Sequence, residues 1–346
     1  MSTQERRGGL NNIIILVFVL VYILCIKIPI AEATTEVIIN TWGGAFLEAF
    51  QAVSGDIEKV SGVKVKLTTH PGAAAGLSRL IAQKDNPQVD LFTGIESTAY
   101  DGGKAGVFEE LNPTLVANMA KVPKELVMPH GVSIWVSLRG IFYRQDMIPF
   151  GIKKWEDLWD PRLKGKVATS ILLDKGNFLI MAALLAGGNE NNIEPGFEKL
   201  KALKPNLLLF YKTDSESIKF LQAGEAAVAG WGILPNVYKL LGPGSNYRFV
   251  IPEKPQFLAP IPVSLVKGRP NKEQSLKVIN AILTKEIQEK LASHLGVVPA
   301  LPGAEPPEKI RDIVPALRNI YKVNWDVVNT NFDKWLDRWN REIQVK

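Results

Sequence analysis

The sequence predicts an α/β protein of two lobes, in which mainly parallel sheets are flanked by helices. At 346 residues, the chain is too long for a single small core. Runs of strand-forming residues alternate with helical periodicity, and strand–helix–strand units of this kind form parallel sheets with right-handed crossovers. Glycine, serine or threonine also stands at the end of each of the first three predicted strands, at the edge where open α/β sheets bind ligands.

The first predicted unit has a glycine turn between a strand, residues 37–40, and an amphipathic helix. The apolar face of that helix consists of Phe46, Phe50, Val53, Ile57 and Val60. The turn itself is Thr41, Trp42, Gly43 and Gly44. Glycine lets a bound molecule approach the backbone N–H groups that begin a helix, and those groups favour anions. The turn therefore predicts a ligand contact, with a tight connection around a core tryptophan as the alternative.

Two similar turns follow. Residues 63–67 alternate apolar side chains with lysines, as in a strand with one wet face, and Gly72 and Ala73 then precede a helix over 77–83. A third strand over 89–93 ends beside Glu96 and Ser97. We expect these four residues to share one sheet edge with residues 41–44 and to contact the ligand.

The N-terminus has the three parts of a secretory signal: Arg6 and Arg7, an apolar run over 13–26, and Ala31-Glu32-Ala33. The apolar run has 14 residues, fewer than the roughly 20 that span a bilayer. We expect cleavage after Ala33, export to the periplasm or another extracytoplasmic space, and a mature chain that begins at Thr34. An uncleaved membrane anchor is the alternative.

Composition excludes several classes of protein. Without residues 1–33, the chain keeps 38 of its 41 basic and 33 of its 35 acidic side chains. This mild excess of positive charge is scattered, so it does not predict a nucleic-acid surface. Cys25, the only cysteine, lies within the predicted signal, so the mature chain has neither disulfides nor cysteine chemistry.

The middle of the chain predicts a passage between lobes. Residues 133–143 read as one long strand that could run from one lobe to the other. In the block that follows, Trp155 and Trp159 are one helical turn apart and are expected in the core.

Several motifs then resemble a known family when they are taken in order. They are Trp42-Gly43-Gly44, Val89-Asp90-Leu91 leading to Glu96, Trp155…Leu158-Trp159-Asp160-Pro161…Lys164-Gly165-Lys166-Val167, Phe220-Leu221-Gln222-Ala223-Gly224-Glu225-Ala226-Ala227, Val266-Lys267-Gly268…Pro270-Asn271-Lys272-Glu273, and Trp335…Arg338-Trp339-Asn340. The sequence resembles the extracytoplasmic solute-binding proteins of ABC importers, in the group that includes polyamine and ferric-iron binders.

The resemblance implies a type II periplasmic-binding-protein fold, in which two lobes joined by a hinge of crossing strands close on a ligand. It also implies delivery of that ligand to an ABC importer permease in the membrane. We expect the first lobe over 34–138 and 261–303, and the second over 139–260 and 304–346. The protein is expected to act as a monomer, without a cofactor.

The second lobe adds further candidate residues. An apolar helix is expected to begin near Lys175, Gly176 and Asn177 and to end at residue 185, and Trp231 lies at the end of a predicted strand. Phe257 opens a returning hinge strand over 257–266. Trp42 and Trp231 would form aromatic walls on opposite sides of the ligand. The C-terminal helix over 325–343 carries a face of tryptophans that is expected in the core.

No catalytic pattern was found in the sequence. His70, His130 and His294 lack metal-ligand spacing, and neither a nucleophile elbow nor a phosphate loop occurs. A binding protein needs only fixed donors, aromatic faces and a hinge. A scaffold or an anchored extracytoplasmic enzyme is the remaining alternative.

The ligand is expected to be anionic or zwitterionic, such as an organic acid, an amino acid or a phosphonate. Lys175 stands where the resemblance implies carboxylates in polyamine binders, and the ferric binders' tyrosine pair is missing. Glu96 could accept an amine, which would make the ligand zwitterionic. Asp174 lies close to Lys175, so a polyamine ligand is the alternative.

Overall fold

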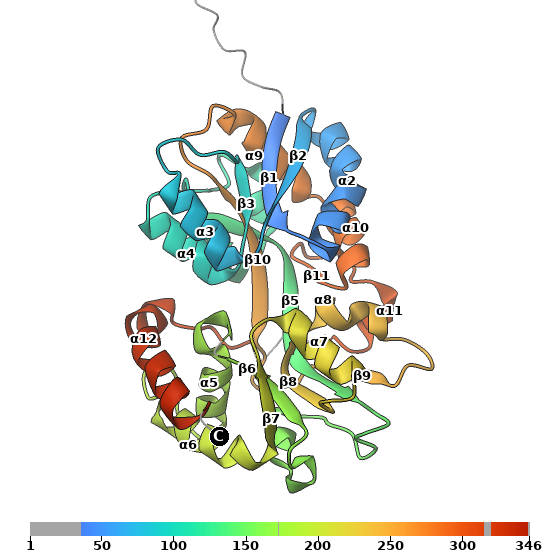
Figure 1. Cartoon of the computed structure of the whole chain (residues 1–346). Coiled ribbons are helices and arrows are strands. Elements are labelled where there is room, and N and C mark those ends of the chain that lie inside the picture. The colour runs from blue at the N-terminus through green and yellow to red at the C-terminus, as the bar shows by residue number, and fades with distance from the viewer. Residues whose placement is uncertain (1–35, 172, 315–319, 345–346) are drawn as a thin grey trace, which may run out of the picture. The chain divides into compact units, whose positions relative to one another are not determined.

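Two long strands, β5 (Gly131–Arg144) and β10 (Leu258–Leu265), run side by side between two groups of strands and helices (Figure 1). The structure is a computed structural model and describes residues 36–171, 173–314 and 320–344. By their contacts, the described residues from Glu36 onward belong to one unit. The predicted signal, residues 1–33, lies outside the described residues.

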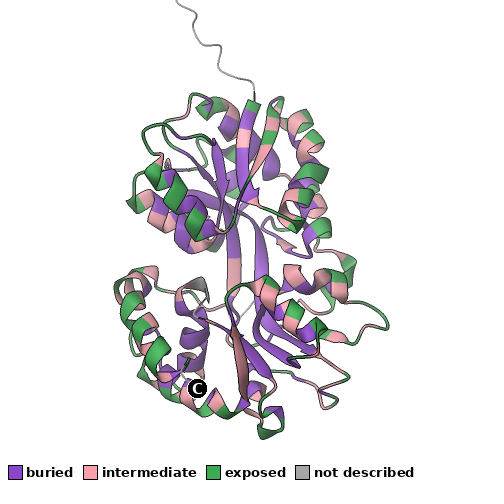
Figure 2. Cartoon of the chain, in the orientation of Figure 1, coloured by how far each residue is buried: buried purple, intermediate pink, exposed green. Residues whose placement is uncertain are grey.

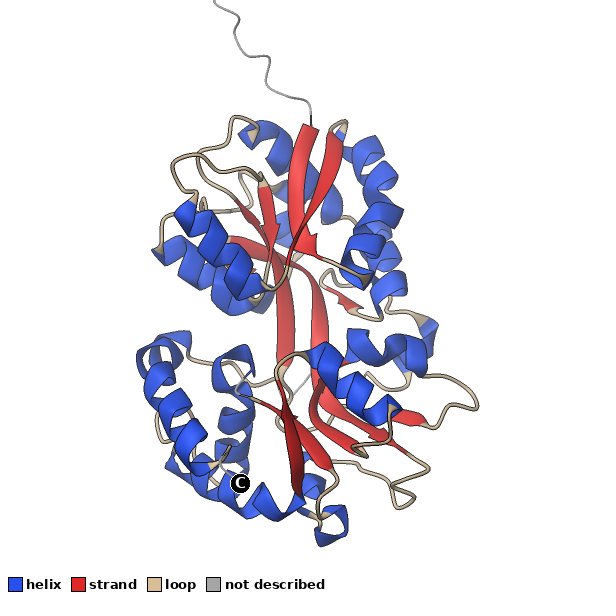
Figure 3. Cartoon of the chain, in the orientation of Figure 1, coloured by secondary structure: helices blue, strands red, loops and turns tan. Residues whose placement is uncertain are grey.

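Figure 3 shows how helices cover the strands. The other strands are β1 (Glu36–Trp42), β2 (Lys64–His70), β3 (Leu91–Thr93), β4 (Val127–Met128), β6 (Val167–Ser170), β7 (Leu207–Tyr211), β8 (Val228–Ile233), β9 (Tyr247–Val250) and β11 (Val298–Pro299). The α-helices are α2 (Ala45–Ser61), α3 (Ala73–Ala82), α4 (Glu96–Lys104), α5 (Leu173–Leu185), α6 (Glu194–Leu203), α7 (Asp214–Gln222), α8 (Leu234–Val237), α9 (Lys272–Ile282), α10 (Lys285–Leu295), α11 (Glu308–Arg311) and α12 (Trp325–Glu342).

The strands follow the order β2-β1-β3-β10-β5-β8-β6-β7, and β4, β9 and β11 pair with β5. Within each lobe the outer strands are parallel: β1 pairs with β2 and β3, and β6 pairs with β7 and β8. The hinge strands β5 and β10 pair antiparallel with each other and with their neighbours. The predicted α/β fold of two lobes is confirmed.

The strand β5 belongs to both lobes. Residues 132–138 pair with β10, and from Arg139 onward the strand pairs with β8 and β9. One core cluster joins β1, α2, α9 and α10, and a second joins β8, α5, α6 and α12. The hinge strand β5 is buried along its length up to Tyr143 (Figure 2). The predicted residue limits of the lobes stay predictions.

Packing corrects three local expectations. Val60 is 52% exposed although the helical period placed it inward, because it lies in the last turn of α2, where left-handed Gly62 turns the chain toward β2. The helix expected from Gly176 begins at Leu173. Trp155 and Trp159 lie in a short 3₁₀-helix, and only Trp155 is fully buried.

Candidate functional site

In the first lobe, three parallel strands end at one edge, each followed by a turn and a helix. They end at Trp42, His70 and Thr93, and α2, α3 and α4 begin a few residues later. Gly44 has a left-handed φ of 62°, which explains the need for glycine there. A Cβ added at Gly43, Gly44 or Gly72 would meet nothing within 4 Å, so the space beside these backbones is open.

Behind these turns lies a buried polar network. The Thr93 hydroxyl donates to the Thr41 hydroxyl at 2.9 Å, and His70 Nε2 lies 3.0 Å from the Thr93 carbonyl oxygen. Burial lowers the pKa of His70, so its imidazole is neutral at pH 7. Trp42 is half-buried, and its ring lies 5.1 Å from Phe46 and 4.9 Å from His70. Thr41 therefore holds this edge together, and Trp42 covers it.

Glu96 begins α4 at the same edge and is half-buried, while Ser97 is buried. Burial raises the pKa of the Glu96 carboxyl, and the neighbouring indole N–H of Trp325 opposes this rise. No ion pair of Glu96 is found among the residues that the structure describes. Tyr100, one turn further along α4, also has a raised pKa, chiefly through burial and then through the charges of Glu96 and Asp326.

In the second lobe, β6, β7 and β8 also end at one edge, at Ser170, Tyr211 and Ile233. Lys175 has a φ of +51° and Gly176 a φ of +92°, so the first turn of α5 is irregular. Left-handed backbone is unfavourable for a lysine and signals a local constraint.

Lys175 makes one side-chain contact to the first lobe and one within the second. Lys175 Nζ donates to Asp101 Oδ2 at 2.6 Å and to Asn329 Oδ1 at 2.8 Å. Asp101 lies on α4 and Asn329 on α12, so these three side chains join elements of both lobes. An anionic ligand would compete with Asp101 for Lys175, and the predicted role of Lys175 in ligand binding stays a prediction.

Trp231 and Phe257 are brought together, but inside the second lobe. Trp231 is fully buried, and its ring lies 5.2 Å from Trp155, 5.6 Å from Phe178 and 5.3 Å from Phe257. Trp42 is not among the ring contacts of Trp231 in the described residues. The pairing of two aromatic walls across the ligand therefore stays a prediction.

Arg139 is the residue that the sequence analysis passed over. It is 3% exposed, its Nη1 donates to Asp214 Oδ1 at 2.7 Å, and its guanidinium carbon lies 5.9 Å from the centre of the Trp231 ring. A lone arginine within an otherwise uncharged strand, residues 131–143, was the available signal, because buried charge concentrates at functional sites.

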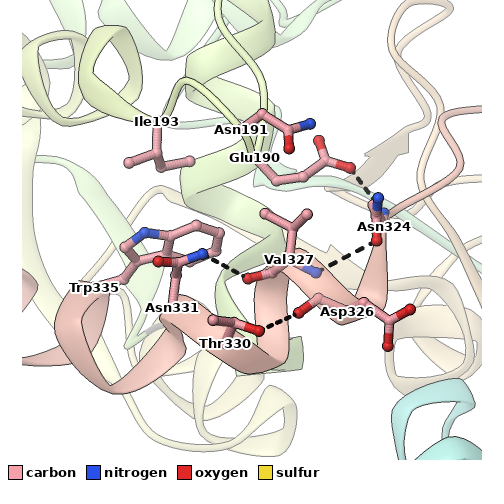
Figure 4. Close-up of a pocket in the computed structure, with 9 residues that line it drawn as sticks. All are labelled: Glu190, Asn191, Ile193, Asn324, Asp326, Val327, Thr330, Asn331 and Trp335. Atoms are coloured by element: carbon pink, nitrogen blue, oxygen red, sulfur yellow. Dashed lines mark hydrogen bonds between the residues drawn. The ribbon is translucent and has the colours of Figure 1, made fainter.

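A pocket of about 510 Å³ lies beside α12 (Figure 4). Several of its polar groups have partners: Glu190 Oε1 accepts from the Asn324 N–H at 2.8 Å, and Thr330 and Asn331 donate to carbonyls of their own helix. Glu190 also accepts from the Tyr321 hydroxyl. These bonds stabilise the start of α12.

The described residues contain no cluster of histidine, cysteine and carboxylate side chains that could hold a metal ion. In the same ranges, no helix is long and apolar enough to cross a membrane.

Residues 45–314 match the family model of bacterial extracellular solute-binding proteins. A Salmonella typhimurium periplasmic protein assigned to 2-aminoethylphosphonate binding is 22% identical over 312 residues, 87% of this chain and 88% of the relative. The spermidine/putrescine-binding periplasmic protein of the same species is 24% identical over 292 residues, 77% and 80% of the two chains. The crystal structure of an ABC transporter protein from Clostridium perfringens superposes with a TM-score of 0.74 at 26% identity, covering 89% of this chain and 99% of that one.

The two lobes, the hinge and the two strand edges define a periplasmic-binding-protein fold of the type that ABC importers use. The chain belongs to the bacterial extracellular solute-binding proteins. The resemblance stated from the motifs is confirmed, and the family is one of binding proteins rather than enzymes.

Proposed function

We propose that this protein captures a small zwitterionic ligand between its lobes and delivers it, as a monomer, to an ABC importer permease. The observation that carries the proposal is Glu96. It is a half-buried carboxylate at the carboxyl edge of the first lobe, with no ion pair in the described ranges. A primary amine of the ligand would supply the missing cation and offset the unfavourable burial of the charge.

The glycine turns supply the complementary donors. The first backbone N–H groups of α2 and α3 have no partner within their helices, and the space beside Gly43, Gly44 and Gly72 is open. Helix N-termini favour anionic groups, so these turns suit a carboxylate or a phosphonate. Ala73, Ser97, Gly176 and Asn177 complete the proposed lining of the site.

A polyamine is the second candidate, because α4 carries Asp101 besides Glu96 and Asp326 lies nearby, although an amine would have to displace the lysines with which the two aspartates pair. The charges of Glu96 and Asp326 both raise the pKa of Tyr100, which places the two carboxylates in one neighbourhood. The relatives divide in the same way, since one is assigned to an aminophosphonate and the other is named for spermidine and putrescine. Both kinds of ligand carry a primary amine.

A thermal-shift screen of residues 34–346 against amino acids, organic acids, aminophosphonates and polyamines would test the proposal. A ligand present at 100 times its dissociation constant stabilises the folded state by about 2.7 kcal/mol. Glu96→Gln should lower the affinity for the best amine ligand by roughly tenfold or more, because a charged partner is replaced by a neutral amide. Glu48→Gln, an exposed change in α2, serves as the control. Equal binding by the parent and Glu96→Gln would remove the amine site.

A further inference from the structure

In the hinge and the second lobe, several buried polar side chains have no hydrogen-bond partner among the residues that the structure describes. They are the hydroxyls of Ser137, Thr169 and Ser170, the amide oxygen of Asn177 and the indole N–H of Trp231. The exposed fractions of these residues run from 0% to 6%. Native proteins pair nearly all such groups, so an unpaired set needs an explanation.

Strand register places three of these residues, Ser137, Ser170 and Trp231, close to Arg139. β6 and β8 pair Val167 with Val228 and Ala168 with Ala229. The same register continued by two residues sets Ser170 beside Trp231. β5 pairs Arg139 with Ile233, at the end of β8, and Ser137 shares the face of β5 on which Arg139 lies.

Arg139 gives this edge its charge. Its guanidinium is buried between Asp214, at 2.7 Å, and the Trp231 ring, at 5.9 Å. The planar guanidinium matches the oxygens of carboxylates and phosphonates, and hydroxyl and indole donors fit the same acceptor. A cationic amine would be repelled by the positive charge of Arg139.

We propose that this edge binds the anionic end of the ligand, through Arg139, Ser170, Asn177 and the indole N–H of Trp231. The assignment rests on the proposed function and makes it specific. The oxyanion lies against the second lobe, and the amine lies against Glu96 of the first. A ligand with both charges then links the lobes, whereas one with a single charge holds only one of them. Carboxylate and phosphonate share the chemistry that this edge recognises.

Calorimetric titration with four probes tests the assignment: 2-aminoethylphosphonate, β-alanine, ethylphosphonate and putrescine. Of the two zwitterions, the tighter one identifies the oxyanion. Ser170→Ala should weaken binding of that zwitterion about tenfold while leaving the unfolding midpoint equal to or above that of the parent, because the lost hydroxyl has no partner in the described part of the chain. Ser275→Ala is the matched control, since Ser275 on α9 is equally buried and its hydroxyl is also unpaired.

Arg139→Lys keeps the positive charge beside Asp214 but removes the planar guanidinium group. It should weaken the binding of both phosphonate and carboxylate probes by more than tenfold. Zwitterion binding that is unchanged in Ser170→Ala and Arg139→Lys would overturn this assignment and leave the proposed function in place. If putrescine were the only probe that bound, and bound with unchanged affinity in both variants, the result would overturn both this assignment and the proposal of a zwitterionic ligand.

Discussion

At the scale of single residues, Trp42 and Trp231 differ in burial, although both were expected to form aromatic walls of the ligand site. Trp231 is fully enclosed by Trp155, Phe178 and Phe257, whereas Trp42 is half-buried at the strand edge. A residue that is part of a core affects stability first, and a residue at the rim of a site affects binding first.

We therefore expect different results from the two alanine variants. Trp231→Ala should lower the free energy of unfolding by about 3–5 kcal/mol, because it leaves a large cavity. Trp42→Ala should lower it by less and should weaken ligand binding by about 1–3 kcal/mol. Urea denaturation and calorimetry measure the two quantities. Equal stability losses in both variants would contradict this distinction.

His70 predicts a pH dependence of stability. Burial holds its folded-state pKa below the ordinary value of 6.5, so the unfolded state takes up the proton more readily. The stability that neutral His70 contributes is thus complete above about pH 6.5 and is lost as the pH falls through the folded-state pKa. His70→Gln should flatten this part of the stability curve in urea unfolding between pH 7 and pH 5, while His294→Gln, a change of an exposed residue, should not.

At the scale of elements, α4 of the first lobe meets α5 and α12 of the second through two ion pairs of different burial. Lys175 and Asp101 are 28% and 29% exposed, whereas Lys104 and Asp326, 3.0 Å apart, are 62% and 87% exposed. Exposed pairs contribute little, and half-buried ones with a further hydrogen bond contribute more. The left-handed backbone of Lys175 is maintained by this contact.

Asp101→Asn should therefore speed ligand release. The loss of about 1 kcal/mol from the closed state corresponds to a rise in the dissociation rate of roughly fivefold. Asp326→Asn, which breaks the exposed pair, is the matched control and should change the rate by less than about twofold. Stopped-flow tryptophan fluorescence follows the release. A dissociation rate that responds equally to both substitutions would show that Lys175 and Asp101 do not hold the lobes together.

At the scale of the whole molecule, the proposed capture of a ligand requires two lobes that move about β5 and β10, and a location outside the cytoplasm. The family and its periplasmic relatives support such a location. The signal over residues 1–33 stays a prediction, because it lies outside the described residues.

We expect the exported protein to begin at Thr34. Intact-mass spectrometry of protein recovered from the extracytoplasmic fraction should give the mass of residues 34–346. A mass that still includes the apolar run over 13–26 would instead indicate an anchored protein, and Ala33→Asp, which blocks the small-residue site, should produce that larger species deliberately.

The sequence by itself determined the elements and the family. The strand expected over 133–143 lies within β5, and Phe50, Val53 and Ile57 of the expected helix face are buried in α2, because local pattern and propensity agree there. The glycine turns at Gly43-Gly44 and Gly72 followed from the same reasoning, since Gly44 has φ above zero and the space beside all three glycines is open.

Only the tertiary structure decided which charged side chains form ion pairs with one another. The pairing of Lys175 with Asp101 joins residues 74 positions apart, and Arg139 reaches Asp214 over 75 positions. No local pattern records such partners, so Lys175 looked available to a ligand and Arg139 looked like one residue of a strand. Ion pairing and burial depend on which elements the fold brings together, and these two properties determine which charged groups can bind a ligand.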